Sequence, residues 1–430
     1  MTASSSSGST ARRSTLDLIV VADLHMGAGG DPRTGVLDRH EPFRQDEAFA
    51  AFVDHLRGEA LDTARDCRLV LLGDVLDFTF VELYRGRPGR GRLDTTEPAA
   101  LAKIARIAAG HPRVFVALGR FAAAGLGVDL LPGNHDIELL RPDVRDALRQ
   151  RLAVAGGRPD AAARIAFHPW ILRSRGLLHA EHGHQHHDLN RIAELLALEQ
   201  LDGAEELPVP VGTVLGEYLI DLGEALDTDG APRALLDAAR RRPHAAAAPT
   251  ARFAGGVRRS ARTMIRAHRP TRRQRYSDLL RAQAADIGLP PTTLAALDEL
   301  GGTTLWSLAA GLARRGALEP LLARLVPTRS VSPYMLRAAR DVDAVLRGAG
   351  TGASFYVFGH THVATDEPLG SGPEGPRYLN PGTWSTLTRG GEGGEQLAFV
   401  RVSSGGADEA PSAALLRWDP ARGAVLPANK

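Results

Sequence analysis

Short runs of apolar residues recur along the chain, and five of them end at or just before a polar turn. These runs are Asp17–Ala22, Leu69–Leu72, Val128–Leu131, Gly176–Ala180 and Ser354–Phe358. Continuous apolar runs of this length predict buried strands. Segments with apolar residues at helical spacing lie between them, at Glu47–Gly58, Pro98–Ala109 and Arg113–Ala124. Strands that alternate with helices predict an α/β fold.

The pattern changes between His187 and Thr351, where Ala, Leu and Arg dominate and no clear strand is found. The predicted helices there are Leu189–Glu205, Val214–Leu226, Ala231–Arg241, Ser277–Ile287, Thr292–Leu300, Leu305–Arg314 and Met335–Arg347. We therefore expect a helical insertion, residues 188–350, within a domain formed by residues 15–187 and 351–430. Residues 1–14 are expected to be a disordered tail rich in Ser and Thr. The segments Gln396–Val402 and Ala413–Trp418 are expected to finish a sheet edge.

Each of the five apolar runs leads into a motif of metal-binding residue types. In chain order the motifs are Asp23-Leu24-His25, Gly73-Asp74-Val75-Leu76-Asp77, Gly133-Asn134-His135-Asp136, His182-Gly183-His184 and Gly359-His360-Thr361-His362. Ligands bind at the carboxyl ends of strands in α/β sheets, which is where these motifs are expected to lie. Any one motif alone is commonly a turn, but the ordered set predicts a site for two divalent cations that hydrolyses a phosphate ester. Mixed oxygen and nitrogen ligands suit Mn, Fe, Zn or Co, of which we favour Mn.

The chemistry of two adjacent cations assigns a role to each ligand type. Two cations about 3.5–4 Å apart need a bridging carboxylate, and Asp74 is the candidate because it follows the central strand. Asp23 and His25, two residues apart, can share one cation, and Asn134 offers a neutral amide oxygen. The remaining predicted ligands are His182, His360 and His362.

His135 lies beside a predicted ligand but is not needed as one. A free imidazole there can protonate the leaving oxygen or bind the phosphate. Asp77, three residues after Asp74, is placed to orient and charge that imidazole. His184 is a candidate for a further imidazole near the metals, either beside the ligands or in contact with substrate, and this interpretation stays open. His186 and His187 are expected to be polar residues at the start of the first inserted helix.

The ordered motifs resemble the calcineurin-like metallophosphoesterase superfamily, over about residues 15–190 and 350–402. The resemblance implies an α/β sandwich of two mixed sheets flanked by helices, here with a large helical insertion as a cap. It implies one cation held by Asp23, His25, Asp74 and His362, a second held by Asp74, Asn134, His182 and His360, and an acid/base pair of His135 and Asp77. Asn380-Pro381-Gly382-Thr383-Trp384 resembles the turn that follows the last motif.

Within that superfamily, the His-Gly-x motif and the insertion are similar to the UDP-2,3-diacylglucosamine pyrophosphatases. This chain has His135 where those enzymes typically have Arg, and its insertion is longer. An insertion between two motifs of one site leaves and re-enters the domain near the metals, which suits a lid or a substrate platform. A structural appendage or a dimer interface is the alternative.

Basic charge is concentrated in the insertion, although 52 basic and 50 acidic residues leave a net charge of only +2. Residues 238–277 hold twelve Arg and no Asp or Glu, and helical spacing would put Arg258, Arg262 and Arg266 on one face. Three interpretations stay open. The segment is a solvated or partly disordered loop, it attracts an anionic substrate, or it contacts an anionic membrane surface or nucleic acid.

Composition further limits the class of protein. The single cysteine, Cys67, excludes an intramolecular disulfide, and no apolar stretch is long enough for a transmembrane helix, so a cytoplasmic protein is expected. We expect a hydrolase acting on the phosphodiester or pyrophosphate bond of a bulky substrate, nucleotide-linked or lipid-linked. A phosphomonoesterase or nuclease of the same fold, and a non-catalytic scaffold, are the alternatives. The oligomeric state stays open.

Overall fold

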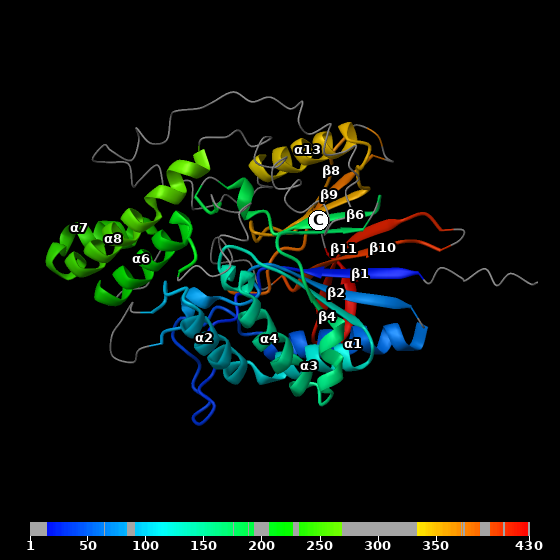
Figure 1. Cartoon of the computed structure of the whole chain (residues 1–430), viewed down its shortest axis with the longest axis horizontal. Coiled ribbons are helices and arrows are strands. Elements are labelled where there is room, and N and C mark those ends of the chain that lie inside the picture. The colour runs from blue at the N-terminus through cyan, green and yellow to red at the C-terminus, as the bar shows by residue number, and fades with distance from the viewer. Residues whose placement is uncertain are drawn as a thin grey trace, which may run out of the picture.

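The computed structural model describes residues 15–63, 65–83, 91–174, 176–187, 189–192, 206–226, 232–268, 333–370, 372, 375–387, 396–406 and 409–428. Two mixed sheets, flanked by helices, form its centre (Figure 1). The described helices are α1 Asp46–Thr63, α2 Glu97–Gly110, α3 Pro112–Ala123, α4 Pro142–Ala155, α6 Val211–Leu226, α7 Pro232–Arg241, α8 Pro243–His268 and α13 Pro333–Gly348. Short 3-10 turns lie at η1 Phe78–Phe80, η2 Ile137–Leu140, η3 Pro159–Arg164 and η4 His184–His186.

The larger sheet has seven strands in the order β12-β11-β10-β1-β2-β3-β4. Its strands are β1 Leu16–Val21, β2 Asp66–Leu72, β3 Gly127–Leu131, β4 Ile165–Phe167, β10 Ala398–Ser403, β11 Ser412–Asp419 and β12 Ala424–Pro427. Strands β1 to β4 run parallel, so their carboxyl ends share one edge. Strands β10, β11 and β12 extend the sheet in antiparallel fashion beyond β1.

The smaller sheet has the order β5-β6-β7-β9-β8. Its strands are β5 Ile171–Ser174, β6 Leu178–Glu181, β7 Phe355–Phe358, β8 Thr365–Pro368 and β9 Arg377–Asn380. The central strands β6, β7 and β9 are parallel to one another. The two edge strands, β5 and β8, are antiparallel to their neighbours.

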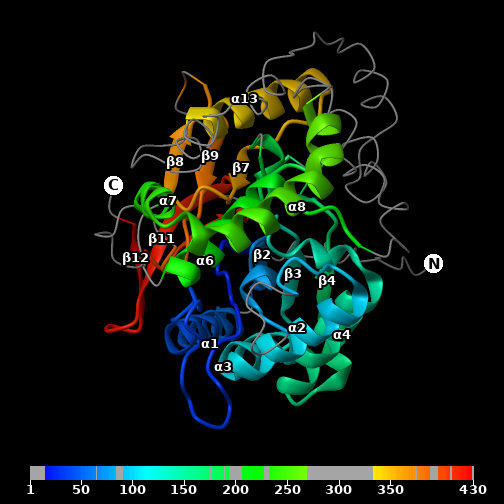
Figure 2. The same ribbon diagram turned by 90° about the vertical axis from the view of Figure 1, so that its left-hand side faces the viewer.

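Alternation along the strands builds the layers, because successive side chains of a strand point to opposite faces. On β1, Leu18 and Val20 join a cluster between the two sheets, whereas Ile19 and Val21 join the cluster under the helices. Helices α1 to α4 cover the outer face of the larger sheet, and α13 packs on the outer face of the smaller one (Figure 1). Helices α6, α7 and α8 form a further cluster at one end of the sandwich (Figure 2).

The predicted strands and helices of the core are found with shifts of a few residues at their ends. The α/β prediction is therefore confirmed, and α1 buries the predicted face of Phe49, Phe52, Val53 and Leu56. One correction concerns the last strands. Strand β10 lies inside the larger sheet between β1 and β11, and the edge is formed by β12, which was not predicted.

Within residues 188–350, helices α6, α7 and α13 confirm three predicted helices. The helix predicted from Leu189 is wrong at its start, because residues 189–190 form a turn and residues 191–192 have no regular secondary structure. Residues 243–268, left open between loop and helix, form the backbone of α8. The tail at residues 1–14 and the helices predicted within residues 277–314 lie outside the described residues.

The single cysteine and the lengths of the apolar helices can be compared with what composition indicated. Cys67 is buried at the start of β2, as expected for a small core thiol. Among the described residues, no helix has both the length and the apolarity needed to cross a membrane.

A buried ionic group joins the helical layer to the loop after the first motif. The Nδ1 atom of His111, between α2 and α3, lies 3.0 Å from Asp46 Oδ1, and its Nε2 lies 3.5 Å from Glu41 Oε2. Glu41 in turn accepts the backbone N–H groups of Gly27 and Gly29. Burial opposes the charged imidazolium, but the two carboxylates outweigh it and raise the pKa of His111 to about 9.

This raised pKa predicts a pH-dependent contribution to stability. Because the pKa of His111 in the folded protein lies above that of an unfolded chain, its contribution is complete below about pH 6.5 and is lost as the pH rises through about 9. The free energy of unfolding, measured with urea, should be higher for the wild type than for His111→Gln. This difference should be larger at pH 6 than at pH 10 by on the order of 3 kcal/mol. A difference that does not change with pH would contradict the assigned ion pair.

Candidate metal centre

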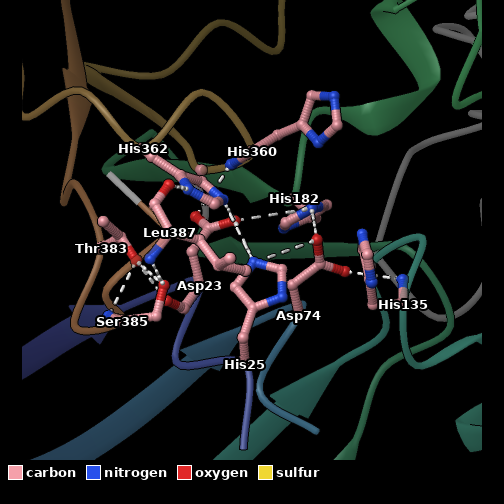
Figure 3. Close-up of polar contacts among 12 residues, drawn as sticks. Asp23, His25, Asp74, His135, His182, His360, His362, Thr383, Ser385 and Leu387 are labelled. Atoms are coloured by element: carbon pink, nitrogen blue, oxygen red, sulfur yellow. Dashed lines mark hydrogen bonds and ion pairs between the residues drawn. The ribbon is translucent and has the colours of Figure 1, made fainter. Parts of the chain in front are cut away.

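The parallel strands of both sheets deliver the five motifs to one place. The first three motifs follow β1, β2 and β3 of the larger sheet, and the last two follow β6 and β7 of the smaller one. Figure 3 shows the acidic and imidazole side chains of these turns directed toward one another between the two sheets. The residues predicted as ligands are buried or half-buried, namely Asp23, His25, Asp74, Asn134, His182, His360 and His362.

Three groups of side chains in the described residues bring their ligand atoms within 4.8 Å of one another. They are Asp23, His25 and His362; Asp74, His182 and His360; and His25, Asp74 and His135. The Oδ2 atom of Asp74 lies 3.2 Å from His182 Nε2 and 3.8 Å from His25 Nε2. Asp74 therefore stands between the first two groups, each of which could hold a divalent cation.

Unsatisfied buried atoms test whether these residues fit a metal. Among the buried side-chain atoms that make no hydrogen bond in the described residues are Asp23 Oδ1, Asn134 Oδ1 and His182 Nε2. Two of them have a charged neighbour instead: His182 Nε2 lies 3.2 Å from Asp74 Oδ2, and Asp23 Oδ1 lies 3.3 Å from His362 Nε2. Buried polar atoms of this kind are uncommon, because each has lost its hydrogen bonds to water. All three are atoms that can ligate a cation, and all three belong to predicted ligands. The residues present therefore fit a divalent cation.

Backbone strain is concentrated at the same residues. Six residues other than glycine have positive φ in the described chain, and five of them are Asp23 (55°), His25 (53°), Asp74 (50°), His360 (70°) and His362 (58°). Such left-handed conformations cost side chains of this kind about 1–3 kcal/mol each and collect at functional sites. The surrounding structure holds these turns in a geometry that the chain alone would not adopt.

Two motif glycines make room for the ligands. A Cβ atom at Gly133 would lie 2.1 Å from Asp74 Oδ1. Gly73 has a φ of +81°, and a Cβ there would lie 2.6 Å from the His182 ring. These close approaches explain why Gly73 precedes Asp74 and Gly133 precedes Asn134.

Hydrogen bonds behind three of the histidines fix which nitrogen faces the site. The Nδ1 atom of His182 donates to the carbonyl of Leu72 over 2.9 Å, and that of His362 donates to the carbonyl of Leu387 over 3.0 Å. His25 Nδ1 lies 2.8 Å from Asp77 Oδ2. In each ring the Nε2 atom faces the other predicted ligands, a cluster that we term the centre. This is the usual arrangement for metal-binding histidines.

His135 combines a buried contact with an accessible ring. Its Nδ1 lies 3.0 Å from Asp77 Oδ2, and its side chain is 23% exposed. Burial opposes the charged form, but Asp77 and Asp74 outweigh it and raise the pKa of His135 to about 10. The imidazolium form is thereby favoured near neutral pH. The same Asp77 oxygen also contacts His25, so Asp77 serves one more histidine than the sequence predicted.

Asp136, the last residue of the third motif, received no role from the sequence. Its carboxylate accepts the N–H groups of Gly133 (2.5 Å), Val75 (2.9 Å), Asp74 (3.2 Å) and Leu76 (3.3 Å). It thereby ties the second motif to the third. Its position directly after His135 was the only signal available, since a contact sixty residues away leaves no local pattern.

The turn at residues 380–384 supports the first and last motifs. Asn380 Nδ2 donates to the Gly359 carbonyl over 2.9 Å, and Thr383 Oγ1 donates to the Asp23 carbonyl over 2.6 Å. Both side chains are fully buried. This turn therefore holds the backbone of the first and last motifs through two side-chain hydrogen bonds, a role that the resemblance alone did not indicate.

The remaining predicted residues are less closely associated with the centre. His184 is buried beside His182, with 5.3 Å between ring centroids, but it belongs to none of the three groups. His186 is buried and lies 3.1 Å from Glu181 Oε1, so it does not begin an inserted helix as expected. The residues Arg258, Arg262 and Arg266 lie on the backbone of α8, and their side chains are outside the described part of the chain.

No protein-family model matches this chain, and no curated protein is significantly similar to it in sequence. Support for a function therefore comes from the residues of the centre.

Metal content of an Asp74→Asn variant tests the centre. The group with His182 and His360 would lose its carboxylate, and the group with Asp23, His25 and His362 would lose the carboxylate beside it, so bound Mn²⁺ measured by mass spectrometry after dialysis should fall by at least about half. Asp129→Asn is the matched control, because Asp129 is equally buried but pairs with Arg68 and His168 away from the ligands. Wild-type metal content in Asp74→Asn would exclude Asp74 as a ligand.

Proposed function

We propose that this chain is a dinuclear metal-dependent hydrolase of phosphate esters with a calcineurin-like fold. The observation that supports it most directly is the position of Asp74 between two groups of buried ligands. Asp23, His25, Asp74 and His362 would hold one cation, and Asp74, Asn134, His182 and His360 the other. Mn²⁺ is the favoured ion. When bound, two cations supply charge neutralisation for phosphoryl oxygens and lower the pKa of water.

His135 is the proposed general acid. Its ring is partly exposed on one side and held by Asp77 on the other. Near neutral pH the imidazolium can donate a hydrogen bond to a phosphoryl oxygen and pass its proton to the leaving oxygen. Asp77 keeps the ring oriented and stabilises its positive charge, and Thr79 fixes Asp77 through two hydrogen bonds to Oδ1.

Residues 188–350 are proposed to form a cap that selects a bulky phosphodiester or pyrophosphate. Helix α6 begins at the centre, where Thr213 Oγ1 lies 3.5 Å from the carbonyl oxygen of Asn134. Two carboxylates of α6, Glu217 and Asp221, face Arg92 from the core domain, with closest distances of 3.9 and 3.7 Å. Charged groups this deeply buried favour a fixed position for α6 beside the ligands. Helix α13 packs instead on the smaller sheet.

Hydrolysis of model esters tests the proposed reaction. Protein loaded with Mn²⁺ should hydrolyse bis-p-nitrophenyl phosphate faster than p-nitrophenyl phosphate, because a cap suits a diester. The reverse preference would favour a phosphomonoesterase. Binding and cleavage of DNA with a steep dependence on salt would favour a nuclease. Two bound cations without turnover of any of these esters would favour a scaffold and contradict the proposal.

Replacement of His135 by alanine separates its role from metal binding. The His135→Ala variant should keep the metal content of the wild type and lose about 10²–10⁴-fold in kcat, the usual worth of a general acid. The loss should be smaller for esters whose leaving group needs no proton. If His135→Ala also loses metal, His135 is a ligand and the assigned role is wrong.

A further inference from the structure

One histidine of the centre is held in the opposite sense from the other three. His25, His182 and His362 are each bonded through Nδ1, so that Nε2 faces the centre. His360 is held through Nε2, which lies 3.0 Å from Nδ2 of the Asn190 side-chain amide. The nitrogen of His360 that is left for a cation is therefore Nδ1.

The tautomer of His360 decides whether that nitrogen can ligate. A neutral imidazole carries one proton, and only the unprotonated nitrogen has a lone pair for a cation. A side-chain amide can present its oxygen at either position by a 180° rotation. With its oxygen toward His360, Asn190 accepts the Nε2–H and leaves Nδ1 unprotonated. Outer partners of this kind fix the ring and raise its basicity.

We propose that Asn190 is a positioning residue that fixes the tautomer and ring orientation of His360. The segment that follows the fourth motif would thereby complete the second cation site. This inference rests on the proposed function, because it assumes that Asp74, His182 and His360 hold a cation.

The position of Asn190 is itself set by α6. The carbonyl of Leu189 accepts the N–H of Gly212 over 2.8 Å, and Leu189 is buried in the cluster that holds α6, α7 and α8. A Cβ atom at Gly212 would lie 1.7 Å from the amide atom of Asn190 that points away from His360, in either orientation of the amide, so only glycine allows this approach. Docking of α6 and binding of the second cation are therefore coupled, and each should strengthen the other.

Calorimetric titration of the metal-free protein with Mn²⁺ tests the inference. Asn190→Ala should bind one of the two cations 10- to 100-fold more weakly, in the range typical for loss of an outer partner, and keep the other affinity. Asn190→Asp should restore the affinity, since a carboxylate oxygen accepts the same Nε2–H. Gly212→Ala keeps Asn190 but displaces it, and should lower the affinity for the same cation.

Thr95→Val is the matched control. Thr95 Oγ1 joins the core to Leu207 through two hydrogen bonds without touching a ligand, so this variant should lose stability but keep both affinities. The inference would be overturned if folded Asn190→Ala bound both cations with wild-type affinity, or if Asn190→Asp bound Mn²⁺ as weakly as Asn190→Ala. Either result would leave the proposed function intact. A wild type that binds no Mn²⁺ would refute the proposed function itself.

Discussion

The burial of polar atoms that make no hydrogen bond is the constraint on which the candidate metal centre depends. Asp23, Asn134 and His182 each keep one such atom away from water. Each would cost about 1–3 kcal/mol without a partner, and the strained turns add to this. Two packed sheets, the Asp136 carboxylate and the turn at residues 380–384 offset these terms. The fold thus keeps these unfavourable groups close together, in an arrangement that a divalent cation could stabilise.

The supporting contacts come mainly from residues that take no part in ligation. Asp136 binds two motifs through four N–H groups, and Asp77 contacts two histidines through one oxygen. Removing Asp136 would therefore release the turns of two motifs, although Asp136 belongs to none of the three groups. The geometry of the site depends at least as much on these carboxylates as on the ligands.

The core strands and the gathering of the motif side chains could be predicted because both leave local patterns. Apolar runs mark β1, β2, β3, β6 and β7, and each is followed by a recognisable motif. Strand β8 could not be predicted, because Thr365–Pro368 is mostly polar and forms only by pairing with β9. Helix α4 was overlooked although Val144, Leu148 and Leu152 recur every four residues. The partner of His360 could not be predicted, since Asn190 reaches it across 170 residues of chain.

The pairing of β1 with β10 has a consequence for the order of assembly during synthesis. Asp17 of β1 lies opposite Ser403 of β10, and Thr383 holds the turn at Asp23. Contacts this distant in sequence form late, because a long loop must close before they contribute. As the ribosome makes the chain, the first ligand motif emerges early but lacks its supports until almost four hundred residues have followed. The first motif therefore gains these supports only after β10 has been made, and a chain that stops before β10 exposes β1 to pairing with the wrong strand.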